Sequence, residues 1–249
     1  MSARRVVYGL HAVTAALKRR PGSVMEVFLD PKRNDPRARR IADLARAGGV
    51  RIQDAEAARL DGFASGGRHQ GVAAFVEETP LAMDLDEVIE NAAEPPLLLG
   101  LDGVQDPHNL GACLRVADAM GVQAVFAPKD RATGVNATVR KVASGAAESV
   151  PFIAVTNLAR TLRDLKDKGI WVVGAAEAED GSLFGARLTG PLAMILGAEG
   201  EGLRRLTRET CDQLISIPML GAVESLNVSV AAGICLYEAR RQRQTPQVP

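Results

Sequence analysis

The sequence predicts an α/β protein in two parts, a small N-terminal α/β domain and a larger domain built on a mostly parallel sheet. Patterns typical of strands and helices alternate in two series along the 249 residues, and an acidic segment bounded by prolines separates the series. The composition, 47% hydrophobic and 24% charged, is that of a chain with a packed core. We therefore expect domains at residues 1–78 and 97–249, joined by a linker at 79–96 that carries one short helix.

The first series has two helical patterns and two strand-like ones, with helices at 6–20 and 36–47 and strands at 24–29 and 71–76. The second series is longer. It predicts strands at 97–101, 123–126, 152–155, 170–175, 193–196 and 214–217, and helices at 109–120, 137–147, 158–168, 202–209 and 228–243. This alternation favours a parallel sheet covered on both faces, in which ligands bind beyond the carboxyl ends of the strands.

The formal net charge of zero hides a basic N-terminal part. Residues 1–78 carry 14 lysines and arginines against nine acidic residues, residues 79–96 carry none against five, and residues 97–249 carry 16 against 16. Clusters at 18–20, 32–33 and 37–40 account for much of the excess. A solvated surface explains such clusters, and so does a face that follows the phosphates of a nucleic acid.

Other residue types exclude several classes of protein. The three cysteines are far apart in apolar stretches, which indicates free thiols in a reducing compartment: Cys113, Cys211 and Cys235. The histidines have no neighbouring ligand at metal-site spacing, so we expect no metal site. We find no apolar run long enough to span a bilayer and no signal-peptide pattern, and we expect a cytoplasmic protein.

The turn after the first strand of the larger domain, residues 101–111, lacks the glycine patterns that bind dinucleotides or phosphates. It offers Asn109 near a helix start, and Arg115 six residues later on a neighbouring face of the same helix. Helix capping would by itself explain Asn109. An arginine among apolar residues calls for a partner, and phosphate is a natural one.

Two later segments also follow predicted strands, those at 193–196 and 214–217. In the first, Glu199 lies among glycines just before a helix, and a tight turn without a ligand would have the same pattern. In the second, Ser225 and Asn227 precede the last helix, where either residue would serve as an N-cap.

Together and in this order, three segments resemble the signature motifs of the SpoU (TrmH) family of RNA ribose 2'-O-methyltransferases: DGVQDPHNLGACLRVADAMG, ILGAEGEGL and ISIPMLGAVESLNVSVAAGICLYEA. The resemblance covers residues 97–243. Before the linker, residues 7–13 and 69–72 resemble the L30e-like substrate-binding domain of many members.

The resemblance implies a trefoil-knotted SPOUT methyltransferase domain after the L30e-like domain, with S-adenosylmethionine held in the knot. Such knots are rare enough that periodicity alone would not predict one. The positions that match the family's cofactor contacts are Gly197, Ile217 and Leu226.

The family's catalytic positions match Asn109, Arg115, Glu199, Ser225 and Asn227. Since a guanidinium is a permanent cation, we assign Arg115 to a phosphate beside the target ribose rather than to a general-base role. Asn109 and Asn227 would orient the ribose and Arg115. Ser225 would contact the substrate, and Glu199 would hold the arginine or its own loop.

The L30e-like domain favours a guanosine of 23S rRNA as the substrate and RNA as the partner of residues 1–78. The family also implies a homodimer through the knotted domain, in which the small residues 231–233 of the last helix are candidates for the subunit contact. Alternatives are a tRNA ribose methyltransferase of the same family, a non-catalytic rRNA-binding assembly factor, and a small-molecule methyltransferase of doubly wound type.

Overall fold

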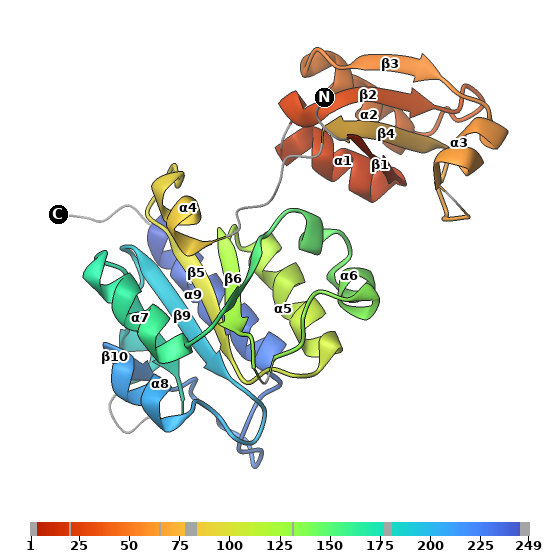
Figure 1. Ribbon diagram of the computed structural model, residues 1–249. Helices are drawn as coiled ribbons and strands as arrows, with labels where there is room; N and C mark the ends of the chain where they lie inside the picture. The colour runs from red at the N-terminus through yellow and green to blue at the C-terminus, as the bar shows by residue number, and fades with distance from the viewer. Residues whose placement is uncertain are drawn as a thin grey trace. The chain divides into compact units, whose positions relative to one another are not determined.

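The computed structural model describes residues 4–19, 21–64, 66–77, 84–130, 132–176 and 181–244. The chain divides into two compact units, Met1–Pro80 and Leu81–Pro249, and Figure 1 labels most of their helices and strands. Each unit has its own sheet and its own hydrophobic cores.

The first unit contains a four-stranded sheet in the order β1-β4-β2-β3. Its strands are β1 (Arg4–Tyr8), β2 (Val24–Leu29), β3 (Arg51–Asp54) and β4 (Val72–Glu77). The pairings of β4 with β1 and with β2 are antiparallel, and β2 pairs with β3 in parallel. Helices α1 (Leu10–Arg19) and α2 (Pro36–Ala47) pack on one face of the sheet, and α3 (Ala57–Ala64) packs on the opposite face.

One prediction for this unit was wrong, and two elements were not predicted. The expected helix over 6–20 is a strand up to Tyr8 and a helix only from Leu10, because Gly9 adopts a φ of 90° between them. Sequence periodicity also missed β3 and α3, which are four and eight residues long. The 3-10 turn η1 (Pro21–Ser23) joins α1 to β2.

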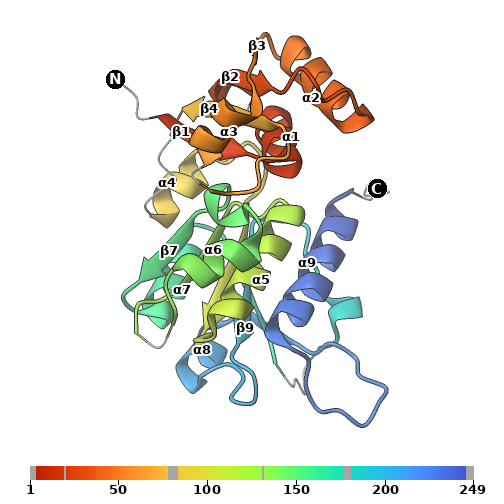
Figure 2. The same ribbon diagram turned by 90° about the vertical axis from the view of Figure 1, so that its right-hand side faces the viewer.

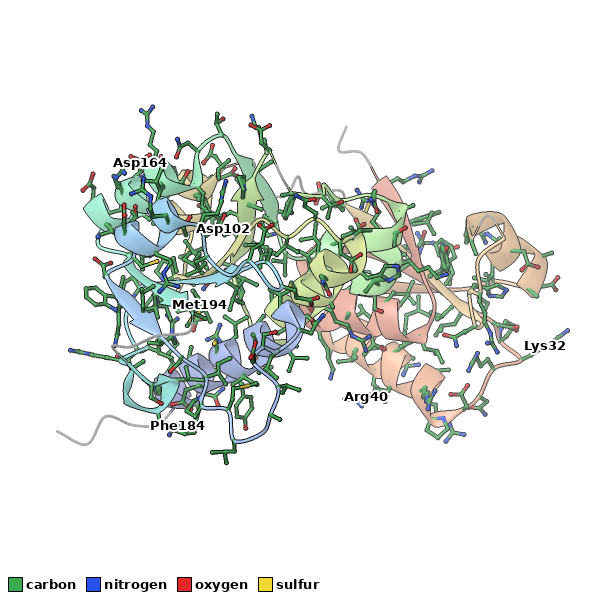
Figure 3. The ribbon with its side chains drawn as sticks, turned by 90° about the horizontal axis from the view of Figure 1, so that it is seen from below. Lys32, Arg40, Asp102, Asp164, Phe184 and Met194 are labelled. Atoms are coloured by element: carbon green, nitrogen blue, oxygen red, sulfur yellow. The ribbon has the colours of Figure 1, made fainter. Side chains whose placement is uncertain are left out.

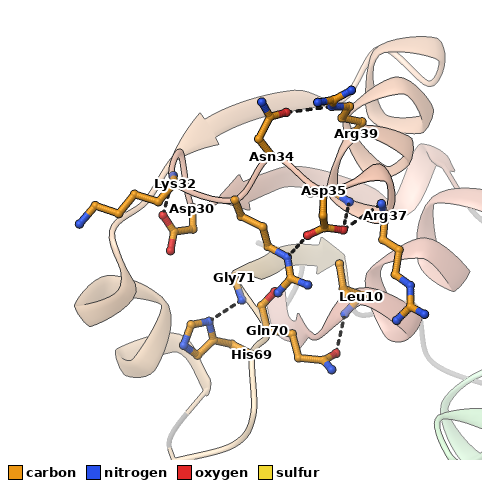
Figure 4. Close-up of polar contacts among 12 residues, drawn as sticks. Leu10, Asp30, Lys32, Asn34, Asp35, Arg37, Arg39, His69, Gln70 and Gly71 are labelled. Atoms are coloured by element: carbon orange, nitrogen blue, oxygen red, sulfur yellow. Dashed lines mark hydrogen bonds and ion pairs between the residues drawn. The ribbon is translucent and has the colours of Figure 1, made fainter.

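A set of polar contacts links the start of α2 to the loop before β4 (Figure 4). Asp35 caps α2 by accepting from the backbone N–H groups of Arg37 and Ala38, and it also accepts from Arg33 Nε at 2.5 Å. The guanidinium of Arg33 donates in addition to the carbonyl of Gln70. The remaining basic residues of this region are exposed, namely Lys32, Arg37, Arg39 and Arg40.

The second unit contains a six-stranded sheet in the order β10-β8-β9-β5-β6-β7, and all five pairings are parallel. Its strands are β5 (Leu97–Asp102), β6 (Ala124–Pro128), β7 (Phe152–Val155), β8 (Trp171–Ala175), β9 (Leu192–Gly197) and β10 (Gln213–Ile215). The predicted α/β class with a mostly parallel sheet is confirmed. The predicted threading of the C-terminal segment through a knot stays a prediction.

Helices cover both faces of this sheet, so the buried strands are apolar on both sides. The helices are α4 (Leu85–Glu90), α5 (Pro107–Ala119), α6 (Ala137–Ala143), α7 (Leu158–Asp167), α8 (Arg205–Thr210) and α9 (Val228–Gln244). Alternate residues of β5 show the two sides, since Leu99 packs with α5, α6 and α9 and Leu98 with α4 and α7. Figure 2 shows α5 and α9 in front of the strands on one face.

Some boundaries differ from those predicted. The expected helix over 137–147 is α6 followed by the 3-10 turn η2 (Ala146–Glu148), because Ser144 and Gly145 both have positive φ. The short helix of the expected linker, α4, packs Leu85 and Val88 into the core of the second unit. In the part of the chain that the structure describes, no helix is long and apolar enough to cross a bilayer.

Candidate active site

The carboxyl ends of β5 and β9 lie side by side, with Asp102 of one strand paired in register with Gly197 of the other. The chain leaves β5 through Gly103, whose φ is 84°, and enters α5 at Pro107. Asp106 caps that helix by accepting from the N–H of His108 at 3.0 Å. Asn109 therefore lies inside the first turn and is not the cap, which leaves its side chain available for other contacts.

Three predicted residues meet here from three separate segments. Asn109 Nδ2 donates to Glu199 Oε1 at 3.2 Å, and Asn227 Nδ2 donates to Asn109 Oδ1 at 2.9 Å. Asn227 Nδ2 also donates to Glu199 Oε1. One carboxylate oxygen thus receives both amides, and the three side chains hold one another in a fixed arrangement.

Asn227 also begins the last helix. Its Oδ1 accepts from the backbone N–H of Ser229 at 2.9 Å and from Ser229 Oγ at 2.6 Å. The sequence presented helix capping and a place in the candidate site as alternatives for Asn227. In the structure this residue both caps α9 and contacts Asn109 and Glu199. The cap fixes the side chain so that its amide faces Asn109 and Glu199.

Glu199 lies in a tight turn after β9, residues 198–202, which we call the Glu199 turn. Gly202 N donates to the carbonyl of Ala198 at 2.9 Å, and Gly200 and Gly202 have φ values of 78° and 64°. At Gly197, an added Cβ would lie 2.0 Å from the carbonyl carbon of Gly202. The glycines therefore serve the turn itself, and α8 begins at Arg205 rather than at 202 as predicted.

The other two predicted catalytic residues are exposed. Arg115 lies on α5 about 120° around the helix axis from Asn109. Ser225 lies in the segment before α9. Within the described residues, neither side chain forms a hydrogen bond or an ion pair, so both are available to a ligand.

The three predicted cofactor positions lie at the end of β9 or in the segment between β10 and α9. Gly197 ends β9, Ile217 follows β10, and Leu226 precedes α9. Ile217 packs against the larger core, and both Ile217 and Leu226 are half-buried. Half-buried apolar side chains are surroundings that suit the aromatic base of a nucleoside.

A cleft of about 260 Å³ opens at the junction of β5, α5 and the Glu199 turn. Asn109 and Glu199 line it together with three polar residues that the sequence reasoning did not select, Gln105, Asp106 and Glu201. All three lie inside the first two motifs, and this position was the sequence feature that could have identified them as candidate site residues. A larger hollow of about 480 Å³ lies between α4, β7 and α7, away from the predicted residues.

The electrostatics next to the site keep its cysteine neutral. Burial raises the pKa of the Cys113 thiol to about 12, and the negative charge of Glu199 adds to the effect. Cys113 is thus a packing residue of α5 and no nucleophile. Among the described residues no group of three or more histidine, cysteine or acidic side chains is arranged to hold a metal ion.

Comparison with known proteins addresses the family directly. The model of the SpoU rRNA Methylase family matches residues 96–237, which include all three motifs. The chain belongs to this family. A second model, RNA 2'-O ribose methyltransferase substrate binding, matches residues 6–81.

Relatives in the SpoU family match almost the whole chain. The 23S rRNA (guanosine-2'-O-)-methyltransferase RlmB of Ralstonia nicotianae is 58% identical over 98% of both chains. RlmB of Neisseria meningitidis serogroup B is 53% identical over 98% of this chain and 97% of its own.

Solved structures agree. The SpoU methyltransferase AviRb from Streptomyces viridochromogenes, crystallised with AdoMet, is 28% identical with a TM-score of 0.64 and covers 96% of this chain and 90% of its own. The TrmH/SpoU tRNA modifying enzyme of A. aeolicus is 32% identical with a TM-score of 0.55, but covers 60% of this chain and 76% of its own. The predicted family is confirmed.

Proposed function

We propose that this protein transfers a methyl group from S-adenosylmethionine to the ribose 2'-hydroxyl of a guanosine in 23S rRNA. The observation that carries the proposal is the hydrogen bonding of Asn109, Glu199 and Asn227 to one another, because these residues come from three motifs of one methyltransferase family. Near full-length similarity to RlmB proteins supports the substrate.

The N-terminal unit favours rRNA over tRNA as the substrate. Residues 6–81 match a substrate-binding domain, whereas the A. aeolicus tRNA enzyme aligns with 60% of this chain. The exposed Lys32, Arg37, Arg39 and Arg40 supply the positive charge that an RNA backbone requires. We assign RNA binding to residues 1–78, methyl transfer to 97–249 and the junction to 79–96, and place the enzyme in the cytoplasm with its rRNA substrate.

Residues of the second and third motifs fit a methyl donor. Gly197, Ile217 and Leu226 would hold S-adenosylmethionine, the half-buried Ile217 and Leu226 offering apolar surface to its adenine. When bound, the cofactor supplies an activated methyl group on sulfur. The chain's own tasks are to align the 2'-hydroxyl with that methyl and to manage its proton.

Each residue of the site has a task that its bonding allows. Glu199 accepts from both asparagines, so their amide planes are fixed and the second N–H of Asn109 can donate to a ribose oxygen. Arg115 binds the phosphate next to the target ribose and favours negative charge on the attacking oxygen, with that phosphate or water accepting the proton. Ser225 donates to the same RNA segment.

Methyl transfer from tritiated S-adenosylmethionine to 23S rRNA, with mapping of the labelled nucleotide, tests the function. Loss of one guanosine 2'-O-methyl group in a deletion strain is the expected cellular result. Label in tRNA alone would overturn the substrate assignment, and absence of label in any RNA would overturn the activity. For Arg115, near-normal turnover of Arg115→Lys at saturating RNA would contradict the phosphate role, since lysine lacks a bidentate fork.

A homodimer through α9 is also part of the proposal. Of the small residues expected at the contact, Ala232 is fully buried and Ala231 is partly buried against the unit's own core. Val230, Ile234 and Tyr237, spaced four and three residues apart, are 48%, 37% and 64% exposed. This spacing places them on one face of α9, which forms the apolar stripe that a second copy would cover.

A further inference from the structure

Asp102 is a buried carboxylate that the proposed reaction does not use. It ends β5 inside the second unit, where Figure 3 labels it, and only 1% of the residue is exposed. Burying a charge is costly unless hydrogen bonds and an opposite charge compensate it. Arg204 provides both, since its backbone N–H donates to Oδ2 at 2.9 Å and its Nε to Oδ1 at 2.5 Å.

The main chain of Asp102 also anchors the beginning of the Glu199 turn. The main-chain carbonyl of Asp102 accepts from the N–H of Ala198 at 3.0 Å. Ala198 and Gly202 form an antiparallel bridge, and Arg204 follows two residues later. Asp102 therefore fixes the chain just before Glu199 through its carbonyl, and just after the turn through its carboxylate.

The position of this turn determines where the Glu199 carboxylate lies. Glu199 is exposed, and its contacts to Asn109 and Asn227 connect it to residues 90 and 28 positions away. A displacement of the turn would therefore separate the carboxylate from both amides. Nearby elements cannot correct this, because β9 ends at Gly197 and α8 begins only at Arg205.

We propose that Asp102 and Arg204 are positioning residues for methyl transfer, which act by holding the turn so that Glu199 orders the two asparagines. The inference rests on the proposed function. The simpler explanation is that the pair only anchors the start of α8, because Arg204 is the residue that precedes this helix. The two explanations differ in whether loss of the pair changes turnover beyond its effect on stability.

The chain offers a matched control in Lys166 and Asp212. Lys166 Nζ lies 2.8 Å from Asp212 Oδ1, and Asp212 Oδ2 accepts from the N–H of Val172 at 2.9 Å. As at Asp102, one carboxylate oxygen binds a cation and the other a backbone N–H, and the carboxylate is mostly buried, with 16% exposed. This pair joins α7 to the residue before β10, and among the described residues neither side chain forms a hydrogen bond or an ion pair with residues 198–202.

The experiment compares Asp102→Asn with Asp212→Asn in the full chain. We expect kcat of Asp102→Asn, at saturating S-adenosylmethionine and RNA, to fall by about tenfold to a hundredfold, as misplacement of reacting groups does. The KM for either substrate should change by less than about threefold, because loss of transition-state contacts acts on kcat. Asp212→Asn should keep kcat within about twofold while losing comparable thermal stability. Equal kcat effects in the two variants, or none in Asp102→Asn, would overturn the proposal.

A second readout does not need activity. The side-chain amide ¹⁵N–¹H signals of Asn109 and Asn227 should move in Asp102→Asn and stay in place in Asp212→Asn, and unmoved signals in both would overturn the proposal. If Asp102→Asn does not fold, Arg204→Lys takes its place, since it keeps the backbone donor and a positive charge. Its kcat should fall at least about threefold, because lysine cannot reproduce the planar guanidinium contact. An enzyme without transfer to any RNA would refute the function, while the amide signals would still decide the role of Asp102.

Discussion

Replacement of Gly197 by alanine tests how the end of β9 supports the site. The new methyl group would lie 2.0 Å from the carbonyl carbon of Gly202, 2.2 Å from its oxygen and 2.4 Å from the nitrogen of Leu203. All three are backbone atoms, so no side-chain rotation relieves the contact. To bring the shortest contact from 2.0 Å to an ordinary 3.4 Å, the turn must move away from the strand by about 1.4 Å.

This displacement predicts two measurable losses. Overpacking of this kind costs about 1–3 kcal/mol, and a loss of about 2 kcal/mol lowers the melting temperature of a unit of this size by about 4–8 °C. The turn carries Glu199, and a displacement of about 1 Å at a catalytic group costs about a hundredfold in rate. We therefore expect Gly197→Ala to lose most turnover even at temperatures where it is fully folded.

Thermal melting followed by circular dichroism, calorimetric titration with S-adenosylmethionine and single-turnover methyl transfer measure these effects. Gly185→Ala is the control, because an added methyl group there has no atom within 4 Å and no positive φ to adopt. Gly185→Ala should match the natural protein in all three assays. If Gly197→Ala binds the cofactor and turns over as Gly185→Ala does, the close backbone contact is not what holds the turn.

Three further changes test other parts of the second unit. Arg243, near the end of α9, donates hydrogen bonds to four backbone carbonyls, those of Leu188, Pro95, Pro96 and Gly190. Arg243→Ala should therefore lower the free energy of unfolding, measured by urea denaturation, by about 2–4 kcal/mol. A change below about 0.5 kcal/mol would contradict an anchoring role for α9. Ile234→Glu places a charge on the exposed α9 stripe and should shift the protein towards monomer in sedimentation velocity, and an unchanged sedimentation coefficient would argue against that dimer face. Burial raises the pKa of Cys235 from 9.0 to about 12. The thiol therefore contributes stability below about pH 9 that is lost as the pH rises towards 12, and Cys235→Ala should make this alkaline decline shallower; equal slopes would exclude the thiol as a cause.

The sequence by itself determined the elements whose signal is local. Apolar runs of strand length, alternating with amphipathic helices, specified the parallel sheet of the second unit, because a strand buried on both faces must be apolar throughout. In the first unit the same reasoning failed at residues 6–8, where a pattern compatible with a helix forms the end of strand β1. Pairing with β4 decided that outcome, and pairing is not a local property.

The motifs likewise identified Asn109, Glu199 and Asn227 but not how they are connected. Asn109 and Glu199 meet because β5 and β9 are neighbours, although 90 residues separate the two side chains. Asn227 joins them although β10, the strand before its segment, is separated from β9 by β8.

Only the tertiary structure decided these contacts, because strand order and register determine which strand ends share an edge. The same register placed Asp102 next to the Glu199 turn. Its carboxylate is buried away from solvent there, and Arg204 compensates its charge. Local sequence has no signal for such a contact, since its energy depends on burial and on a residue 102 positions away.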